Sequence, residues 1–587
     1  MPSSPDHLEV PDDDQKFRRS LDGGRDSESQ LVNCFATPPR SRASSVTSFL
    51  SNVDLKPRQN HLPQPVLDLL NAKQLDVDEH SIISWRQDSI SLPRNWTSKQ
   101  KIYYTAGICL AHFASSLFGN TGSTVANYAK EDLEISQTLS IFSFVTMYWI
   151  GQALGSFIFP PVSEVFGDKR LFSWAAACFG TTCLIVATGP NLWSVLLGRF
   201  LSGMVAAVPS VAALGTFEHL WNAKGRIWLL SVWAVSGVLG FALGPVMGSH
   251  VSETGAGWEW VYYGGLIANV VIGIFCFLMT ETQPNLLLHQ EVRQIEKATG
   301  FGGLRLDESH RIPSYAEFAQ HQLLLPLKLS TTEPLILLST LLAAFSFGLT
   351  TLFTETVPIV YTSQFDLSPQ TSSLTFLALA LGALLFSWLP RVYDIHRHHA
   401  FRPIRSSTSP NPTAPEPEKK LWSYSFIASP IFVLALWWFS FTVPNPVFGS
   451  SNPSAWLSIV PLLLIGYCLV EFNSILPLYL TEVYSHHTAS ANAPLHAIRA
   501  LLAGIFPLFA AKEFDALGPH RAVWVLAGIA TGFCGLAVAT RFVAKTVREK
   551  SKFAKKVAEE REKTLWKGNL EVVVETEVDV VRTRSVV

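Results

Sequence analysis

Several ionisable residues of this sequence lie inside long apolar stretches, where a charge needs a specific reason to be present. Glu355 and Glu471 lie deep in two such stretches, and Asn473 lies in the same stretch as Glu471. A charge at the centre of a membrane helix costs roughly 2.5–3.5 kcal/mol, so such residues are usually paired or functional. Burial raises the pKa of a carboxyl group toward neutrality, which lets the group bind and release protons. We therefore expect Glu355 or Glu471 to carry protons, with a Glu471–Arg499 ion pair as the structural alternative.

A basic residue lies in the stretch Leu197-Gly-Arg199-Phe-Leu-Ser-Gly203. Arg199 stands about a third of the way into an apolar segment, too deep to reach the membrane surface freely. It must have a partner, and two roles remain open. It is either a structural anchor against Glu164 or part of a functional relay.

Glycines recur at spacings of three and four in the segment from Gly237 to Gly248. This spacing gives one smooth helix face against which a second helix can pack closely. Pro245 removes a backbone hydrogen bond and bends the helix. The pattern Gly240, Gly244, Pro245 and Gly248 therefore indicates a bent, closely packed helix, either for packing alone or as a gate between two halves.

The elements that carry these residues are apolar runs of about twenty residues, the length that crosses a bilayer. Only 16% of the 587 residues are charged, against about a quarter in soluble proteins. The runs are predicted at 101–122, 137–158, 171–189, 192–216, 226–248, 258–279, 335–358, 371–390, 421–443, 455–479, 488–511 and 521–543. The fold class expected is an all-α membrane protein with twelve transmembrane helices in two six-helix halves.

Composition shifts divide the chain into five parts. We expect a disordered cytoplasmic tail (1–98), a six-helix half (99–280), a cytoplasmic loop (281–334), a second half (335–543) and a charged cytoplasmic tail (544–587). Lysine and arginine set the orientation, because cytoplasmic loops carry more of them. The loops on one side hold ten: Lys169, Arg170, Lys224, Arg226, Arg391, Arg397, Arg402, Arg405, Lys419 and Lys420. The loops on the other side hold only Lys130, Lys512 and Arg521, so both termini are predicted to be cytoplasmic.

Other function classes lack their signatures. The net charge of −1 gives no basic field for nucleic acid. The seven cysteines are scattered without metal or redox spacing, and we expect no metal and no cofactor. The sequence contains neither a phosphate-binding loop nor a His-Glu-x-x-His motif, so we expect no enzyme and no ATP-driven pump.

Several motifs together resemble the major facilitator superfamily. Pro160 to Arg170 is similar to its loop between spans 2 and 3, Arg199 with Gly203 to its span-4 motif, and Gly240 to Gly248 to its span-5 antiporter motif. Further motifs resemble the fungal, twelve-span drug:proton antiporter branch: Trp258-Glu-Trp260, Glu281-Thr282, Phe353-Thr-Glu355-Thr-Val-Pro358, Tyr479-Leu-Thr-Glu482-Val-Tyr484, Arg499 and Phe506-Pro507-Leu-Phe509. The chain departs from the pattern at Asp168, which adds a negative charge to the loop, and at Ser249, where the branch has glycine.

The resemblance implies a central cavity lined by spans 1, 4, 7 and 10, which places Asn120, Glu355, Glu471 and Asn473 there. It implies export of a small organic molecule, such as a drug, toxin, secondary metabolite or polyamine, driven by protons through alternating access. The alternatives are a proton symporter for uptake and a membrane sensor without transport. The expected partners are the substrate, protons and the lipid bilayer, with no nucleic acid. We expect a monomer in the plasma membrane, with the vacuolar membrane as the alternative location.

Overall fold

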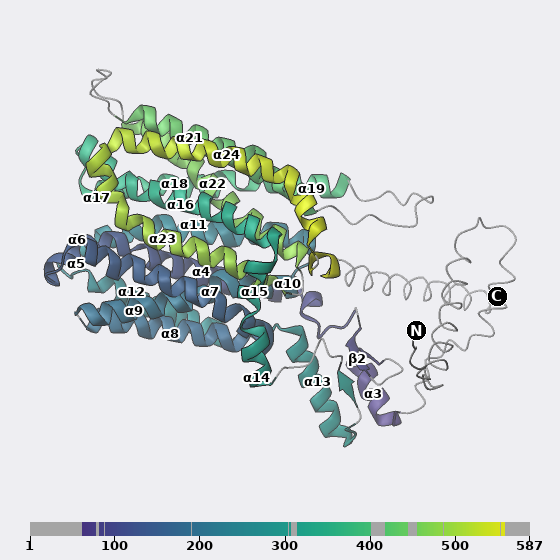
Figure 1. Cartoon of the computed structure of the whole chain (residues 1–587). Coiled ribbons are helices and arrows are strands. Elements are labelled where there is room, and N and C mark those ends of the chain that lie inside the picture. The colour runs from purple at the N-terminus through teal and green to yellow at the C-terminus, as the bar shows by residue number, and fades with distance from the viewer. Residues whose placement is uncertain are drawn as a thin grey trace, which may run out of the picture.

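A computed structural model describes residues 62–557, apart from residues 78–81, 87, 190, 303, 307–313, 401–416, 444–454, 485–486 and 552. Long helices run side by side in one bundle, with a small mixed unit attached at one end (Figure 1). Residues 1–61 and 558–587, which belong to the two predicted tails, lie outside the described residues.

The first half of the bundle contains six long helical segments. They are α4 (Ser98–Asn120), continued by α5 (Gly122–Asp132); α6, η2 and α7 (Gln137–Ile141, Phe142–Thr146, Met147–Phe166); α8 (Asp168–Thr188); α9, η3 and α10 (Leu192–Ala207, Val208–Ala212, Ala213–Leu220); α11 (Ala223–Glu253); and α12 (Glu259–Phe277).

The second half contains six more. They are α16 (Pro334–Gln364); α17, α18 and α19 (Pro369–Leu374, Phe376–Phe386, Trp388–Ala400); η6, α20, η7 and α21 (Pro417–Lys420, Leu421–Ser423, Tyr424–Ala428, Ser429–Thr442); α22 (Ala455–Val483); α23 (Thr488–Leu517); and α24 (Pro519–Lys550).

The predicted fold class is confirmed. Among the described residues, eleven helices are long and apolar enough to cross a membrane. Segment α4 is the twelfth, and it carries polar residues that face a cavity, including His112, Ser115 and Ser116. Thr97 begins this helix with a capping box. Its side chain accepts from the Gln100 backbone N–H, and the Gln100 side chain accepts from the Thr97 backbone N–H.

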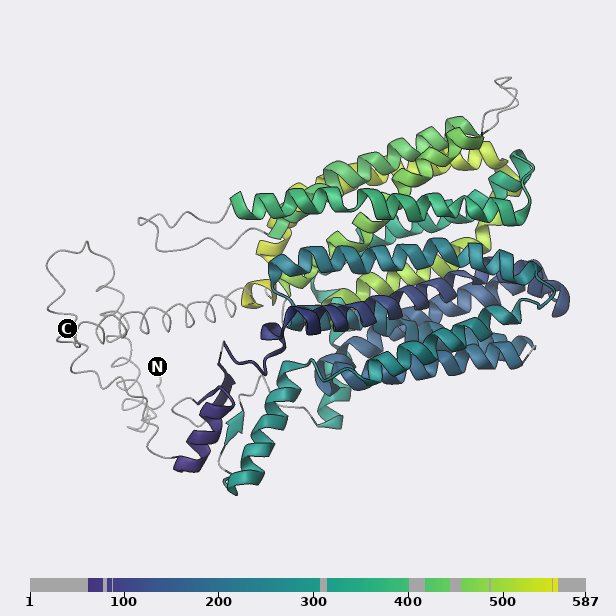
Figure 2. The same cartoon turned by 180° about the vertical axis from the view of Figure 1, so that it is seen from behind.

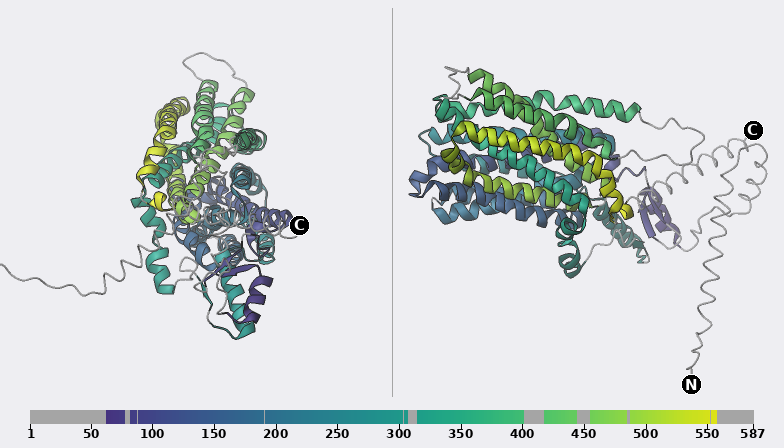
Figure 3. Two further views of the ribbon diagram at one scale, coloured as in Figure 1. Left: turned by 90° about the vertical axis from the view of Figure 1, so that its right-hand side faces the viewer. Right: turned by 45° about the horizontal axis from the view of Figure 1, so that its top comes forward.

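The two halves meet along a few helices near the middle of the bundle. Helix α11 packs along α18 and α22, and α7 packs along α23. In the end-on view, the green and yellow second half lies above the purple and blue first half (Figure 3). Seen from behind, α4 runs through the middle of the bundle, where it packs against α11 and α12 (Figure 2).

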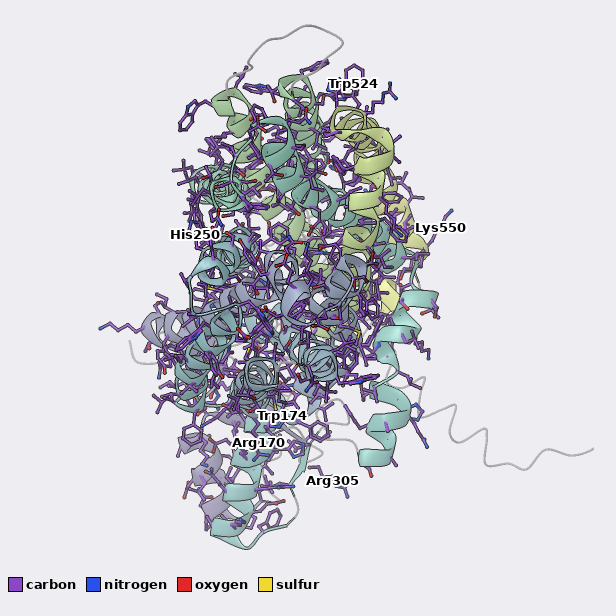
Figure 4. The ribbon with its side chains drawn as sticks, turned by 90° about the vertical axis from the view of Figure 1, so that its left-hand side faces the viewer. Arg170, Trp174, His250, Arg305, Trp524 and Lys550 are labelled. Atoms are coloured by element: carbon purple, nitrogen blue, oxygen red, sulfur yellow. The ribbon has the colours of Figure 1, made fainter. Side chains whose placement is uncertain are left out.

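Large apolar side chains cover the outside of the bundle. Trp174 and Trp524 lie on this outer surface (Figure 4), and Trp193, Phe441 and Phe542 are each at least 69% exposed. Soluble monomers rarely expose apolar surface on this scale. This exterior is suited to lipid, as expected for a multi-pass membrane protein.

The glycine face of α11 lies against α4 of the same half. A side chain on Gly240 would collide with the Phe113 carbonyl, and one on Gly248 would collide with Thr124. A Cβ on Gly244 would lie 2.8 Å from the Leu117 carbonyl oxygen. The glycines therefore bring α11 against α4 and its continuation α5, while α11 also meets α18 and α22 of the second half.

Close glycine packing also recurs in both halves. Helices α7 and α9 approach through Gly151 and Gly203, and α18 and α22 approach through Gly382 and Gly466; a side chain at any of these positions would collide with the facing backbone. The two pairs are the second and fourth segments of their halves. This correspondence supports a repeated six-helix unit.

Replacing Gly244 with leucine is expected to push α4 away from α11 and to reduce transport several-fold, because large residues at glycine contacts separate membrane helices. Transport and protein level in membranes would be measured together. Gly535→Leu is the matched control, since a side chain there meets nothing within 4 Å. Equal loss in both variants would contradict the assignment.

A small unit of helices and strands corrects one prediction. The segment 62–98 was expected to be disordered, yet it forms α3 (Gln64–Ala72), β1 (Leu75–Val77), β2 (Ile82–Trp85) and η1 (Pro93–Asn95). Strand β2 pairs antiparallel with β1 and parallel with β3 (Arg305–Leu306) of the central loop.

This unit has its own apolar core. Val66, Leu70 and Ile83 pack with Leu288 and Val292 of α13 (Pro284–Thr299). The tail and the central loop each supply one side of this core, so each covers the apolar residues of the other. That mutual dependence is why the prediction of disorder, made from the tail by itself, is wrong here.

Candidate functional site

Two cavities lie between the halves of the bundle. The central cavity has an empty volume of about 640 Å³, including space open to solvent, and is lined by α4, α7 and α11 of the first half and by α16, α22 and α23 of the second. The second, which we call the Glu355 cavity, has an empty volume of about 510 Å³ by the same measure. Asn120, Trp149 and Phe241 line both cavities, so the two spaces adjoin.

Glu355 lies in α16 and lines the second cavity with Thr351, Thr354 and Pro358 of the same helix. Within the described part of the chain, no ion-pair partner or hydrogen-bond donor reaches its carboxylate. The amide of Asn120 is occupied, since its Nδ2 donates to the Ser116 carbonyl oxygen at 2.7 Å. Glu355 is therefore an acid without a charged partner among the described residues and with access to a cavity, which suits a group that exchanges protons.

Arg499 and Asn473 come together in the central cavity. The Arg499 guanidinium donates through Nη2 to Asn473 Oδ1, and it lies 4.3 Å from the centre of the Phe347 ring. This pairing differs from the expected alternative, an ion pair between Arg499 and Glu471.

Two histidines of this cavity were missed in the sequence. His112 of α4 and His496 of α23 both line it, and both lie against the ring of Trp233. A histidine inside an apolar span is costly and therefore worth noting. That rule could have singled out both residues, but nothing in their spacing shows that they meet.

The structure corrects the location of Glu471. Its side chain is fully buried and lines neither cavity; Oε2 accepts from Arg391 Nη2 at 2.6 Å and from the Ser423 hydroxyl at 3.0 Å. Arg391 also donates to Asp394 at 3.0 Å. Arg391 was expected in a cytoplasmic loop, but the helical segment continues past the predicted end at 390 and buries it.

The expected carboxylate partner of Arg199 is also wrong. All three donor nitrogens of its buried side chain reach backbone carbonyls: Nε donates to Phe144 at 2.7 Å, Nη1 to Phe118 at 2.9 Å and Nη2 to Gly119 at 2.8 Å. The guanidinium also lies over the ring of Tyr148, 4.6 Å from its centre. Arg199 therefore fastens the segments around α4 and α7 to α9, and this structural role needs no acid.

Glu164 connects the two halves instead. At the end of α7, its carboxylate accepts from the backbone N–H of Ser490 at 3.0 Å and from the Ser490 hydroxyl at 2.7 Å. Ser490 lies in the first turn of α23, where free N–H groups favour an anion. Near the opposite end of the bundle, Ser249 of α11 donates to the Ser373 hydroxyl of α17 at 2.8 Å. The structure thus holds the halves together near both ends.

Replacing Glu164 with alanine is expected to loosen the contact with Ser490 and to expose the central cavity from that end. In a Gln152→Cys background, labelling by a membrane-impermeant maleimide should become several-fold faster from the Glu164 side. Glu131→Ala, which removes an exposed acid elsewhere, should leave the rate unchanged. An unchanged rate in Glu164→Ala would show that this contact does not hold the halves closed.

Asp168, the extra acid noted in the sequence, is the first residue of α8 and belongs to a buried cluster outside the cavities. Thr282 donates to its Oδ2 at 2.8 Å, and the carboxylate of Glu281 accepts from the Asp168 backbone N–H at 2.9 Å. Burial raises the pKa of Glu281, and the Asp168 carboxylate raises it further, although backbone N–H groups oppose the shift. Gly167 has φ of +96° here and leaves room for the Glu281 carboxylate.

A folded-state pKa above the ordinary value means that ionisation of Glu281 costs stability, and the cost grows as pH rises through that pKa. Glu281→Gln keeps an accepting oxygen but cannot ionise. The melting temperature of the variant minus that of the parent protein should therefore be higher at pH 8 than at pH 5. Thermal unfolding at the two pH values tests this, with Glu131→Gln as control; a difference of opposite sign would contradict it.

Comparison of the sequence with known proteins identifies the family of the chain. The sequence profile described as Major Facilitator Superfamily matches residues 108–408. The chain is 26% identical to the major facilitator superfamily multidrug transporter FLU1 of Candida albicans, over 79% of this chain and 74% of that protein. It is 26% identical to multidrug transporter TPO1_1 of Candida glabrata, over 73% and 72%. It is 25% identical to efflux pump radE of Floropilus chiversii, over 83% and 88%.

Solved structures show the same fold. The proton:xylose symporter XylE superposes with a TM-score of 0.54 at 12% identity, covering 77% of this chain and 97% of that one. The human organic anion transporter MFSD10 superposes with a TM-score of 0.50 at 14% identity, covering 75% and 100%. At these identities the likeness concerns the arrangement of helices alone.

Proposed function

The chain belongs to the major facilitator superfamily of membrane transporters, and from that premise we propose that it exports small organic molecules in exchange for protons. One observation carries the proposal. Glu355 is a carboxylate at a cavity between the halves, with no ion-pair partner among the described residues. A group in this position can take up a proton from one side and release it to the other when the halves rearrange.

Contacts near both ends of the bundle support alternating access. Glu164 with Ser490 joins the halves near one end, and Ser249 with Ser373 joins them near the other. A few hydrogen bonds between rigid halves are readily exchanged for others. Breaking the contacts at one end would open the cavities to that side while the opposite end stays closed.

The direction of transport is proposed from the relatives. FLU1 and TPO1_1 are named multidrug transporters, and radE is named an efflux pump. Export of a drug, toxin or secondary metabolite fits cavities that combine aromatic walls with a few polar groups. The same fold also supports uptake, which remains an outcome of the test.

The orientation is proposed from the loop charges. With both termini in the cytoplasm, Lys169, Arg170 and Lys224 lie on the cytoplasmic side, as the positive-inside rule requires. We propose that the transporter acts as a monomer, because both cavities are formed within one chain. The proposed location is the plasma membrane.

Purified full-length protein in liposomes tests the exchange. The liposomes enclose a pH-sensitive dye and are challenged with panels of organic anions, cations and neutral compounds. Exchange predicts that at least one compound moves protons opposite to its own flux and that an uncoupler abolishes its accumulation. Proton movement in the same direction as the compound would identify a symporter, and transport indifferent to pH would overturn proton coupling.

A further inference from the structure

The central cavity holds a cluster of nitrogen atoms that the protein itself leaves unused. Arg499 Nε and Nη1, His496 Nε2 and His112 Nδ1 are all buried and have no hydrogen-bond partner among the described residues. The residues Arg499 and His496 are only 9% and 7% exposed. Most buried polar groups in proteins are satisfied, so four together indicate a place where a ligand completes the bonding.

The three side chains are held in fixed orientations. The ring of His112 stacks on Trp233, with centres 4.6 Å apart and planes 10° apart, and His496 meets the same ring edge-on at 6.0 Å. Trp233 is anchored by its Nε1, which donates to the Pro209 carbonyl oxygen at 3.0 Å. Arg499 is held by Asn473 and by the Phe347 ring. The unused nitrogens are therefore positioned before any ligand arrives.

The charge of this cluster is one-sided. Among the described residues that line the central cavity, none is aspartate or glutamate, so the Arg499 guanidinium has no counter-ion there. Four aromatic residues, Tyr148, Trp149, Phe241 and Phe347, line the same space beside neutral polar and small residues. A guanidinium offers several donors in one plane, which suits the two oxygens of a carboxylate.

We propose that the central cavity binds the anionic group, most simply a carboxylate, of an aromatic organic substrate, with Arg499 as its counter-ion and His496 and His112 as neighbouring donors. This deepens the proposed export function and rests on it. The proposal also narrows the substrate class expected from the sequence, because cationic drugs and polyamines would meet the uncompensated positive charge of Arg499. The acid of the site, Glu355, lies in the adjoining cavity.

Equilibrium binding to detergent-solubilised full-length protein tests the charge preference. The probes are 2-naphthoate, 2-naphthylmethanol and 2-naphthylmethylammonium, which share one ring system and differ in charge. We expect naphthoate to bind at least about tenfold more tightly than either of the others, as for a hydrogen bond to a charged group. Equal affinity of the alcohol or the ammonium compound, or no naphthoate binding at about 1 mM, would overturn the proposal.

Variants locate the site. Arg499→Gln should weaken naphthoate binding at least about tenfold while leaving the alcohol within about twofold. Arg521→Gln, which removes an exposed arginine at the start of α24, is the control and should change neither. If Arg499→Gln does not fold, His496→Ala provides the same comparison. An unchanged naphthoate preference in a folded variant overturns the site.

Binding without a pH gradient separates this inference from the proposed function. Loss of the charge preference with intact proton exchange would remove the anion site alone. Loss of proton exchange with an intact preference would remove proton coupling and leave the anion site standing.

Discussion

Replacing Glu355 with glutamine is expected to abolish proton-driven transport while leaving the protein folded. Glutamine has nearly the same size and remains polar but cannot carry a proton at any working pH. Glu355 makes no ion pair among the described residues, so its loss leaves no buried charge behind. Accumulation of substrate driven by a pH gradient should fall by at least about tenfold, the scale of one missing catalytic proton-transfer group.

Counterflow measurements distinguish coupling from general damage. Exchange of labelled for unlabelled substrate needs no net proton movement, so Glu355→Gln should retain it. Glu355→Asp keeps a titratable group and should retain part of the driven transport, and Glu131→Gln is the control for an exposed acid. Normal pH-driven accumulation by a folded Glu355→Gln protein would refute the assignment.

Replacing Glu471 with glutamine is expected to destabilise the protein instead of simply uncoupling it. The change leaves Arg391, which is fully buried, without its main counter-ion, although Asp394 still accepts from it. Breaking a buried ion pair on one side typically costs about 3–5 kcal/mol. Thermal unfolding of the solubilised protein should show a clearly lower melting temperature and a reduced folded yield.

A double substitution separates the two interpretations of Glu471. Replacing both Glu471 and Arg391 with methionine removes both charges and should recover much of the stability, as apolar replacements of buried pairs often do. Asp76→Asn breaks an exposed ion pair with Arg86 and should cost about 1 kcal/mol or less. A Glu471→Gln protein of normal stability that lacks only proton coupling would restore Glu471 as the proton carrier.

The sequence established the twelve segments and their approximate ends. Hydropathy is a local property, and the thickness of a bilayer fixes how long each apolar run must be. The predicted ends fall short mainly where a helix continues with polar residues beyond the apolar run, as α24 does from 543 to Lys550. Glu355 could be singled out in the same way, because an acid in an apolar run is unusual wherever the run lies in the fold.

Partner choice could not be established in this way. Arg199, Arg391 and Glu471 were each recognised as buried or basic residues, but their contacts come from other helices. Helix rotation decides which face of a span meets which neighbour, and hydropathy averaged over a span carries little information about rotation. For the same reason, the pairing of strand β2 in the tail with β3 in the central loop could not be predicted from the sequence.

By itself, the amino-acid sequence determined that this protein is a bundle of membrane helices with acids inside it. Only the tertiary structure decided that Glu471 is neutralised by Arg391, and that Arg499, His496 and His112 line the same central cavity. The physical reason is that burial in a bilayer acts on each segment separately. Pairing of charges instead depends on packing between different helices, such as those of Arg391 and Glu471, which are 80 residues apart in the chain.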